Sequence, residues 1–191
     1  FKSFLKKNTK IVHLNPDDPF GDLRKGWKKF VSSISSYDVH FVPKEINRQD
    51  YKERGAKEVL VYDRSFSPDY HRPIKMSENE NTYFKSRIGF IGSYAPLREY
   101  MIYQLISKGI EVAVWGDGWE KGKYWRTIKE FFRAQSQTDD NYVKAISGMD
   151  IALHFIRHEN RDLQDSRTFE IPACGTFMLA ERTIDHERLF V

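Results

Sequence analysis

The chain has 191 residues, of which 40% are hydrophobic and 30% charged, so it can build an apolar core and is not compositionally disordered. This length suits one large domain or parts of two. Its single cysteine, Cys174, excludes an internal disulfide framework and a four-cysteine zinc site. No uncharged apolar run approaches the ~20 residues that span a bilayer. We therefore expect a soluble, cytoplasmic, globular protein.

The net charge is +4, and the excess lies in the first part of the chain. Residues 1–86 contain 17 Lys and Arg against 12 Asp and Glu, whereas residues 87–191 contain 14 against 15. A mild basic bias is compatible with a phosphate-bearing ligand, an anionic membrane surface, nucleic acid or plain solvated lysines. Nucleic acid is disfavoured because residues 87–191 have a net charge of −1 and most aromatics lie in predicted strands, whereas a nucleic-acid surface requires clustered basic residues with interleaved aromatics. A membrane surface is not indicated either.

The first 62 residues alternate short β-branched or aromatic runs with amphipathic segments, which is typical of βαβ units and a parallel sheet. Strands are predicted at residues 10–14, 39–42 and 58–62. Residues 27–34 predict a helix because their large apolar side chains recur at spacings of three and four. A second helix is predicted at residues 48–54, with Gly55 as its C-terminal cap.

Residues 63–84 have a different composition, with Pro68, Pro73 and the polar run 77–81. They show little apolar periodicity, so we interpret them as a connector that contains a domain boundary.

A second α/β series follows the connector. Strands are predicted at residues 87–91, 111–115, 150–155 and 176–180, and helices at residues 97–108, 139–147 and 166–174. Because Phe1 is not an initiator and the chain stops within an apolar segment, we interpret it as a fragment. The predicted fold class is α/β with parallel sheets.

The turn Gly92-Ser93-Tyr94, between a strand and a helix, is a candidate phosphate site. Glycine allows a close backbone approach, and the amides at a helix N-terminus attract anions. The alternative is a tight turn without a ligand. The chain lacks both Gly-x-Gly-x-x-Gly and the P-loop pattern, which disfavours dehydrogenases and ATPases.

Arg98 lies in the first turn of the helix that follows, where a cation opposes the helix dipole. Its planar guanidinium suits a diphosphate. The alternative is an exposed arginine that pairs with Glu99 or another neighbour.

The segment Ser166–Glu181 resembles the nucleotide-sugar site of GT-B glycosyltransferases, whose pattern is Glu, a few small or apolar residues, Gly, two residues and an apolar strand. A wider set of segments is similar to the spore-maturation (CgeB-like) glycosyltransferases. This set comprises Asp17-Asp18-Pro19, Phe90–Tyr94 with Arg98, Trp115–Trp119 and Arg167–Gly175.

The resemblance implies a GT-B-like fold of two Rossmann-like domains, of which the N-terminal one is incomplete. Residues 1–75 would be the last part of the N-terminal, acceptor-side domain and a linker, and residues 85–191 would form the nucleotide-sugar-binding domain. The implied activity is metal-independent, retaining transfer of a sugar from a nucleotide-diphospho-sugar to a glycan, protein or small-molecule acceptor. The alternative is a non-catalytic nucleotide- or sugar-binding module of the same fold.

By the same resemblance, Glu170 would hold the ribose hydroxyls of the donor. Arg98 and Arg167 would neutralise the leaving diphosphate. The other implied nucleotide-sugar-binding residues are Gly92, Ser93, Tyr94, Gly116, Trp119, Ser166, Gly175, Thr176 and Phe177. The alternative for Glu170 is a carboxylate on a helix surface.

Asp17 and Asp18 leave a predicted strand and could act as a base or bind acceptor hydroxyls. Their flanking prolines are equally typical of plain turn-forming aspartates. Many retaining members of the resembled family carry Glu-x7-Glu, but this chain has Asp162 eight residues before Glu170, a side chain shorter by one methylene.

The sequence predicts no metal site. It contains no Asp-x-Asp, the motif with which the other large glycosyltransferase fold holds a metal and a diphosphate. His154 and His158 leave a strand into a loop, where a spacing of four does not place both on one face. We expect no cofactor besides the donor substrate.

Overall fold

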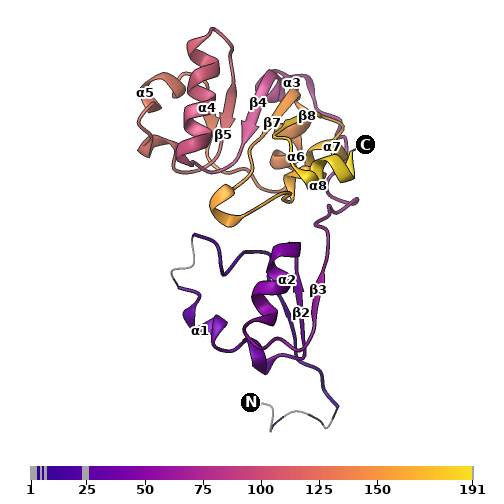
Figure 1. Ribbon diagram of the computed structural model, residues 1–191. Coiled ribbons are helices and arrows are strands. Elements are labelled where there is room, and N and C mark those ends of the chain that lie inside the picture. The colour runs from indigo at the N-terminus through magenta and orange to yellow at the C-terminus, as the bar shows by residue number, and fades with distance from the viewer. Residues whose placement is uncertain (1–3, 5, 7, 23–25, 191) are drawn as a thin grey trace. The chain divides into compact units, whose positions relative to one another are not determined.

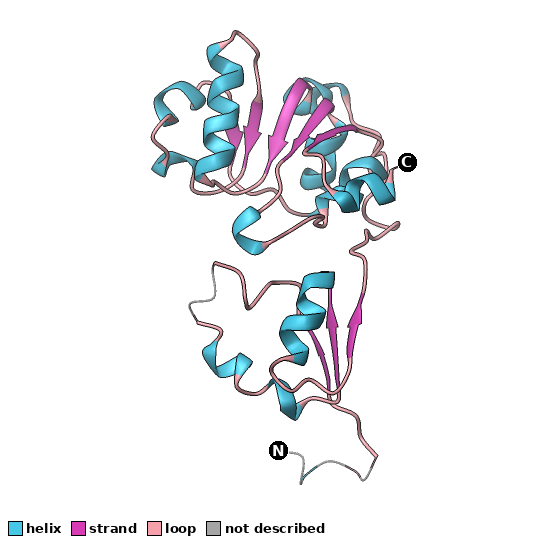
Figure 2. Ribbon diagram, viewed as in Figure 1, coloured by secondary structure: helices cyan, strands magenta, loops and turns pink. Residues whose placement is uncertain are grey.

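The structure is a computed structural model that describes residues 4, 6, 8–22 and 26–190 (Figure 1). The chain divides into two compact units. Unit 1 comprises Phe1–Arg64 and Ile156–Leu163, and unit 2 comprises Ser65–Phe155 and Gln164–Val191. Each unit contains one parallel sheet with helices between its strands, so the predicted α/β class is confirmed (Figure 2). The domain ranges drawn from the sequence stay predictions.

Unit 1 contains a parallel three-stranded sheet in the order β1-β2-β3. The strands are β1 (Val12–Leu14), β2 (Val39–Val42) and β3 (Val59–Val61), each within a predicted range. The connections contain α1 (Lys28–Val31), a 3-10 helix (Ile34–Ser36) and α2 (Glu45–Lys52). The core on one face of the sheet is formed by Ile34, Val42, Tyr51 and Val59.

The helix boundaries of unit 1 differ from the prediction. The helix predicted at residues 27–34 is split into α1 and the 3-10 helix. Helix α2 begins at Glu45, three residues before its predicted start. The sequence did not indicate the first turn of this helix, because the residue that is buried there, Asn47, is polar. Asn47 and Tyr51 lie one turn apart and are both buried, whereas Ile46 is 52% exposed.

A buried ionic network holds Ile156–Leu163 within unit 1. The side chain of Asp18 is fully buried, and its carboxylate accepts hydrogen bonds from the Phe20 amide (2.8 Å) and from Asn47 Nδ2 (3.0 Å). Arg161 donates to both of its oxygens, at 2.6 Å and 2.9 Å. Burial by itself raises the pKa of Asp18, but the bonds from Arg161 and Phe20 and the charge of Lys44 hold it below its ordinary value.

Lys44 is a buried cation of the same network. Its Nζ lies 2.8 Å from Asp162 Oδ1 and also donates to the Asn160 carbonyl. Asn160 in turn donates to Asp162 (2.8 Å) and accepts from the Asp18 amide (3.1 Å). The charges therefore neutralise one another inside the unit, as buried charges require.

Unit 2 contains a parallel five-stranded sheet in the order β6-β5-β4-β7-β8. Its strands are β4 (Ser86–Ile91), β5 (Ala113–Trp115), β6 (Phe132–Ala134), β7 (Met149–His154) and β8 (Phe177–Ala180). The helices are α3 (Glu78–Phe84), α4 (Pro96–Ser107), α5 (Trp125–Ile128), α6 (Asp139–Ser147), α7 (Arg167–Ala173) and α8 (Ile184–Leu189). A 3-10 helix (Trp119–Lys121) follows β5.

Side chains of successive strand residues belong to two separate cores, one on each face of this sheet. In β4, Phe90 packs with Ile102 of α4 and Ile128 of α5. The next residue, Ile91, packs with Val143 of α6. A parallel sheet that is covered on both faces requires apolar residues at consecutive positions, which explains why its strands were visible in the sequence.

The prediction of a plain connector at residues 63–84 is wrong for its last part, which forms α3. The helix begins at a capping box in which Ser77 Oγ accepts from the Glu80 amide and Glu80 Oε2 accepts from the Ser77 amide. These bonds satisfy backbone donors at the start of the helix. They require no apolar spacing in the segment, which is why the sequence did not indicate this helix. Strand β6 and helices α5 and α8 were not predicted either, since each is short and has few buried residues.

None of the helices in the described part of the chain is both long enough and apolar enough to cross a membrane.

The network predicts a large difference between two adjacent aspartates. Asp18→Ala should lower the free energy of unfolding of unit 1 by about 3–5 kcal/mol, because Arg161 and Lys44 each lose a fully buried carboxylate and keep one carboxylate partner, Asp50 and Asp162 respectively. Asp17→Ala is the matched control, since Asp17 is exposed, and it should stay within about 0.5 kcal/mol of the wild type. Hydrogen exchange of peptides from β1 to β3, read by mass spectrometry, measures both. Equal protection in the two variants would contradict a stabilising role for the network.

Candidate functional site

The candidate site of unit 2 lies at the carboxyl ends of its strands, where open α/β sheets bind ligands. Gly92, Ser93 and Tyr94 follow β4, and Gly116 follows β5. Helix α7 begins beyond the end of β7 and carries Arg167 and Glu170. The fold thus places most of the predicted donor-binding residues on segments that leave the same edge of the sheet.

Backbone hydrogen bonds join the turn after β4 to the loop after β5. The Gly92 amide donates to the Trp115 carbonyl (2.9 Å), and the Tyr94 amide donates to the Asp117 carbonyl (2.9 Å). The Trp119 indole donates to the Gly92 carbonyl (3.0 Å). These bonds fix the shape of the Gly92-Ser93-Tyr94 turn, and they already use two of its three amides.

The loop after β5 requires glycine at residue 116. Gly116 has φ +138°, and a Cβ at this position would lie 2.0 Å from the carbonyl oxygen of Gly92. Trp119, which was predicted to contact the nucleotide, is only 1% exposed and packs edge-on against Phe90 and Tyr94. In the structure its ring therefore supports the turn from within the core.

Arg98 is a buried cation in the first turn of α4. Its Nη1 donates to the Ser93 carbonyl (3.0 Å) and its Nη2 donates to the Phe155 carbonyl (3.3 Å). The guanidinium carbon lies 5.5 Å from the centre of the Phe90 ring. Arg98 thus braces the turns after β4 and β7, and its predicted contact with a diphosphate stays a prediction.

Glu170 is partly sheltered on α7, with 16% of its side chain exposed. Its Oε2 accepts a 2.5 Å hydrogen bond from the Tyr142 hydroxyl, and its Oε1 lies 3.7 Å from His71 Nε2. Burial raises the pKa of Tyr142 and the Glu170 charge adds to this rise, although Arg167 opposes it. The Tyr142 hydroxyl therefore keeps its proton and donates to Glu170.

Arg167 has a buried guanidinium nitrogen, Nε. Its Nε has no hydrogen-bond partner among the residues that the structure describes. A buried unpaired donor costs about 1–3 kcal/mol, and more for a charged group, so such an atom calls for an explanation. An anionic ligand on the same guanidinium would offset part of this cost.

Asp165 fixes the start of α7. It accepts from the Arg167 amide (2.8 Å) and from His154 Nε2 (2.9 Å). Burial by itself raises the pKa of Asp165, but His154 and Arg167 lower it well below its ordinary value, so it stays ionised. Ser166, one of the implied nucleotide-sugar-binding residues, occupies the N-cap position of α7 and makes no side-chain capping bond there.

Gly175, Thr176 and Phe177 lie at the other end of α7, where β8 begins. Gly175 has φ +80°, and the Thr176 hydroxyl donates to the Ile146 carbonyl (2.8 Å). Phe177 is 64% exposed. The fold does not group these three residues with Arg167, because the seven residues of α7 separate the two ends by roughly 10 Å.

The two acidic candidates of unit 1 differ in their surroundings. Asp17 is exposed, whereas the carboxylate of Asp18 is taken up by Arg161, Asn47 and the Phe20 amide. Asp162 is 4% exposed and pairs with Lys44. The carboxylates of Asp18 and Asp162 are thus held inside the ionic network of unit 1.

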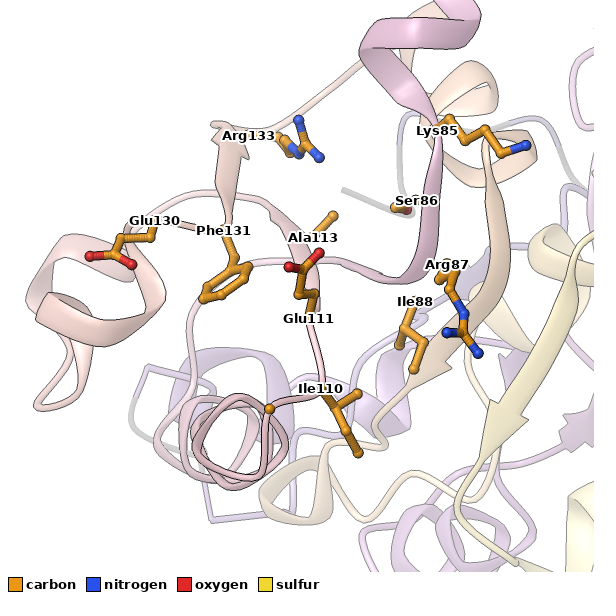
Figure 3. A pocket seen from close by; sticks show the side chains of 11 residues that line it. Lys85, Ser86, Arg87, Ile88, Ile110, Glu111, Ala113, Glu130, Phe131 and Arg133 are labelled. Atoms are coloured by element: carbon orange, nitrogen blue, oxygen red, sulfur yellow. The ribbon is translucent and has the colours of Figure 1, made fainter.

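A cavity of about 860 Å³ lies at the opposite edge of the unit 2 sheet (Figure 3). Its wall includes the start of β4, the segment before β5, and Glu130 to Arg133 around the start of β6. Figure 3 shows Lys85, Arg133 and Glu111 around this opening. None of the predicted site residues lines it. Because open α/β sheets bind ligands at their carboxyl edge, this cavity is not our candidate site.

His71 and Tyr142, the two neighbours of the Glu170 carboxylate, were not predicted as site residues. His71 lies in the stretch interpreted as a connector, and Tyr142 lies on a helix whose apolar residues indicated only core packing. Neither residue is part of a motif. Only the tertiary structure brings them to Glu170.

Residues 98–191 match the model of a family described as glycosyl transferase-like. The matched range runs from Arg98 in α4 to the end of the chain and includes Arg167 and Glu170. No curated protein matches the chain significantly. The family match supports a glycosyltransferase family and, in general terms, a sugar donor and an acceptor.

Substitution of Gly116 should cost more stability than substitution of a glycine that has open space around its Cβ position. Gly116→Ala brings a Cβ onto the Gly92 carbonyl, so we expect a loss of about 2–4 kcal/mol from positive φ and overpacking together. Gly109→Ala is the control, because Gly109 also has positive φ (+80°) but open space around its Cβ. It should lose only about 1–2 kcal/mol. Urea unfolding measures the difference, and equal losses would contradict the contact.

Proposed function

We propose that this chain belongs to a glycosyltransferase that moves a sugar from a nucleotide-diphospho-sugar to an acceptor. The observation that carries the proposal is the family match over residues 98–191, which includes a half-buried carboxylate, Glu170, and a guanidinium, Arg167, with an unsatisfied buried nitrogen. These two side chains lie one helical turn apart on α7.

The proposed chemistry divides the donor between these two groups. A carboxylate accepts two hydrogen bonds from a cis-diol, so Glu170 would bind the ribose. Negative charge grows on the diphosphate as the glycosidic bond breaks, and a fixed cation aimed at that charge lowers the barrier. We assign this part to Arg167, because its buried Nε has no hydrogen-bond partner among the described residues. Arg98 would contribute chiefly through the turn that it braces.

The finer features of the proposal rest on the family resemblance noted in the sequence. By this resemblance, the protein would be a CgeB-like, GT-B hexosyltransferase in the cytoplasm. It would transfer the sugar without a metal and with retention of configuration. Its acceptor would be a glycan, a protein or a small molecule. Metal independence is supported by the absence of Asp-x-Asp from the sequence. Retention would not use a carboxylate at residue 162, because Asp162 is buried and paired with Lys44.

One observation favours a second candidate, a non-catalytic nucleotide- or sugar-binding module. Two acidic side chains that were considered for chemistry, Asp18 and Asp162, are buried and ion-paired within unit 1. A protein that only binds the donor needs Glu170 and Arg167 but no base.

A thermal-shift screen with UDP, GDP, ADP and CDP tests the proposal. Ligand at 100 times its dissociation constant adds about 2.7 kcal/mol of stability, so we expect a raised Tm with at least one of them, with and without EDTA. A tenfold loss of affinity in EDTA would contradict metal independence. Hydrolysis of the matching nucleotide-sugar then separates an enzyme from a binding module. No shift with any nucleotide would overturn the proposal.

Removal of the proposed ribose ligand should weaken nucleotide binding. We expect Glu170→Ala to reduce the affinity for the best nucleoside diphosphate by about 1.5–3 kcal/mol, the range for a hydrogen bond to a charged group. Isothermal titration calorimetry measures it. Glu111→Ala is the matched control, because Glu111 is exposed and lines the cavity at the opposite edge of the sheet. Unchanged affinity in a folded Glu170→Ala protein would refute the ribose role.

A further inference from the structure

The Glu170 carboxylate faces two polar groups from separate segments of unit 2. Tyr142 comes from α6, and His71 comes from the segment between Ser65 and α3. The Tyr142 hydroxyl donates to Oε2 at 2.5 Å, and His71 Nε2 stands 3.7 Å from Oε1. Each oxygen of the carboxylate thus has its own neighbour.

The tautomer of His71 follows from the contact that its other ring nitrogen makes. The backbone amide of Ser67 donates to His71 Nδ1 at 3.1 Å, so Nδ1 is an acceptor. The neutral imidazole therefore carries its proton on Nε2, the nitrogen that faces Glu170. Both neighbours of the carboxylate present a proton to it.

The segment that carries His71 is held against the rest of unit 2 at further points. The Tyr70 hydroxyl lies 3.3 Å from Asp139 Oδ1 at the start of α6. A Cβ on Gly175 would lie 3.2 Å from Pro73 Cγ, so the chain passes close to the end of α7. These contacts fix His71 between the two helices whose residues it faces.

The arrangement leaves part of the carboxylate free for a ligand. An ionised carboxylate has about four acceptor sites, and Tyr142 and His71 face one on each oxygen. With these two neighbours among the described residues, one acceptor site on each oxygen is left for a ligand, and 16% of the Glu170 side chain is exposed. Two acceptors on one planar group match the two hydroxyls of a cis-diol.

We propose that Tyr142 and His71 are positioning residues that hold the Glu170 carboxylate for a ribose cis-diol and so select ribonucleotides. This inference rests on the proposed function. Without the Tyr142 hydrogen bond, the carboxylate can rotate about its side-chain bonds, and diol binding then costs additional conformational entropy. The effect should therefore appear only with ligands that carry both ribose hydroxyls.

The test compares UDP, GDP, ADP and CDP with their 2′,3′-dideoxy counterparts on the whole chain, by calorimetry. We expect Tyr142→Phe, which keeps the ring, to weaken ribonucleotide binding about five- to tenfold. Binding of the dideoxy counterpart should change by less than about twofold. Tyr103→Phe is the matched control, a half-buried tyrosine on α4 that stacks on Tyr124. It should leave both affinities unchanged.

His71 is tested by two replacements. His71→Asn keeps an acceptor for the Ser67 amide but removes the nitrogen that faces Glu170, and it should lower the preference for the ribonucleotide about threefold. His71→Gln places an amide donor nearer to Glu170 and should restore the preference. A structural defect would instead weaken both members of each nucleotide pair.

The outcomes separate the two proposals. If the wild type binds a ribonucleoside diphosphate and Tyr142→Phe keeps the same ratio of ribo to dideoxy affinity, the positioning role is overturned while the proposed function stands. If Tyr142→Phe weakens both ligands equally, its role is structural and the inference is also overturned. If the wild type binds none of the four nucleotides, the proposed function fails and the inference fails with it.

Discussion

Burial of the unit 2 sheet on both faces is the constraint on which the candidate site depends. Helices α4 and α5 pack on one face and α6 on the other, so consecutive residues of β4 and β5 must be apolar. Polar groups that leave the strands can then gather only at the sheet edges. Since all five strands are parallel, the turns after β4, β5 and β7 emerge at one edge and meet there.

The charged groups differ in how many of their hydrogen bonds are made within the protein. Groups whose bonds are made to the protein support the fold, and groups with unused bonds can bind a ligand. Arg98 donates to two carbonyls, and Glu99 accepts from the amides of Lys123 and Tyr124. The Asp18 carboxylate likewise accepts hydrogen bonds from Arg161 and Asn47 within unit 1. Among the residues that the structure describes, by contrast, the buried Nε of Arg167 has no hydrogen-bond partner, and Glu170 keeps exposed surface beside two donors. We therefore assign donor binding chiefly to Arg167 and Glu170 on α7.

The segment between the two sheets belongs to the site as well as to the connection. The polar, proline-containing stretch shows little apolar periodicity, yet Ile74 packs against the unit 2 core, His71 faces Glu170 and Tyr70 contacts Asp139. The contacts of His71 and Tyr70 depend on single polar atoms, which leave no repeating pattern in a sequence. The same holds for α3, whose start depends on two side-chain hydrogen bonds of the capping box.

The sequence by itself determined the α/β class, the parallel strands β1 to β5, β7 and β8, and helices α4, α6 and α7, because burial on regular elements imposes apolar spacing. Its resemblance to GT-B glycosyltransferases also singled out Glu170, Arg167 and Gly116 as expected donor-site residues. Only the tertiary structure decided which charges face one another. It buried Arg98, Trp119, Asp18 and Asp162, and it brought His71 and Tyr142 to Glu170 across 99 and 28 residues of chain. Such long-range pairings depend on how elements pack in space, and local sequence patterns carry no record of that packing.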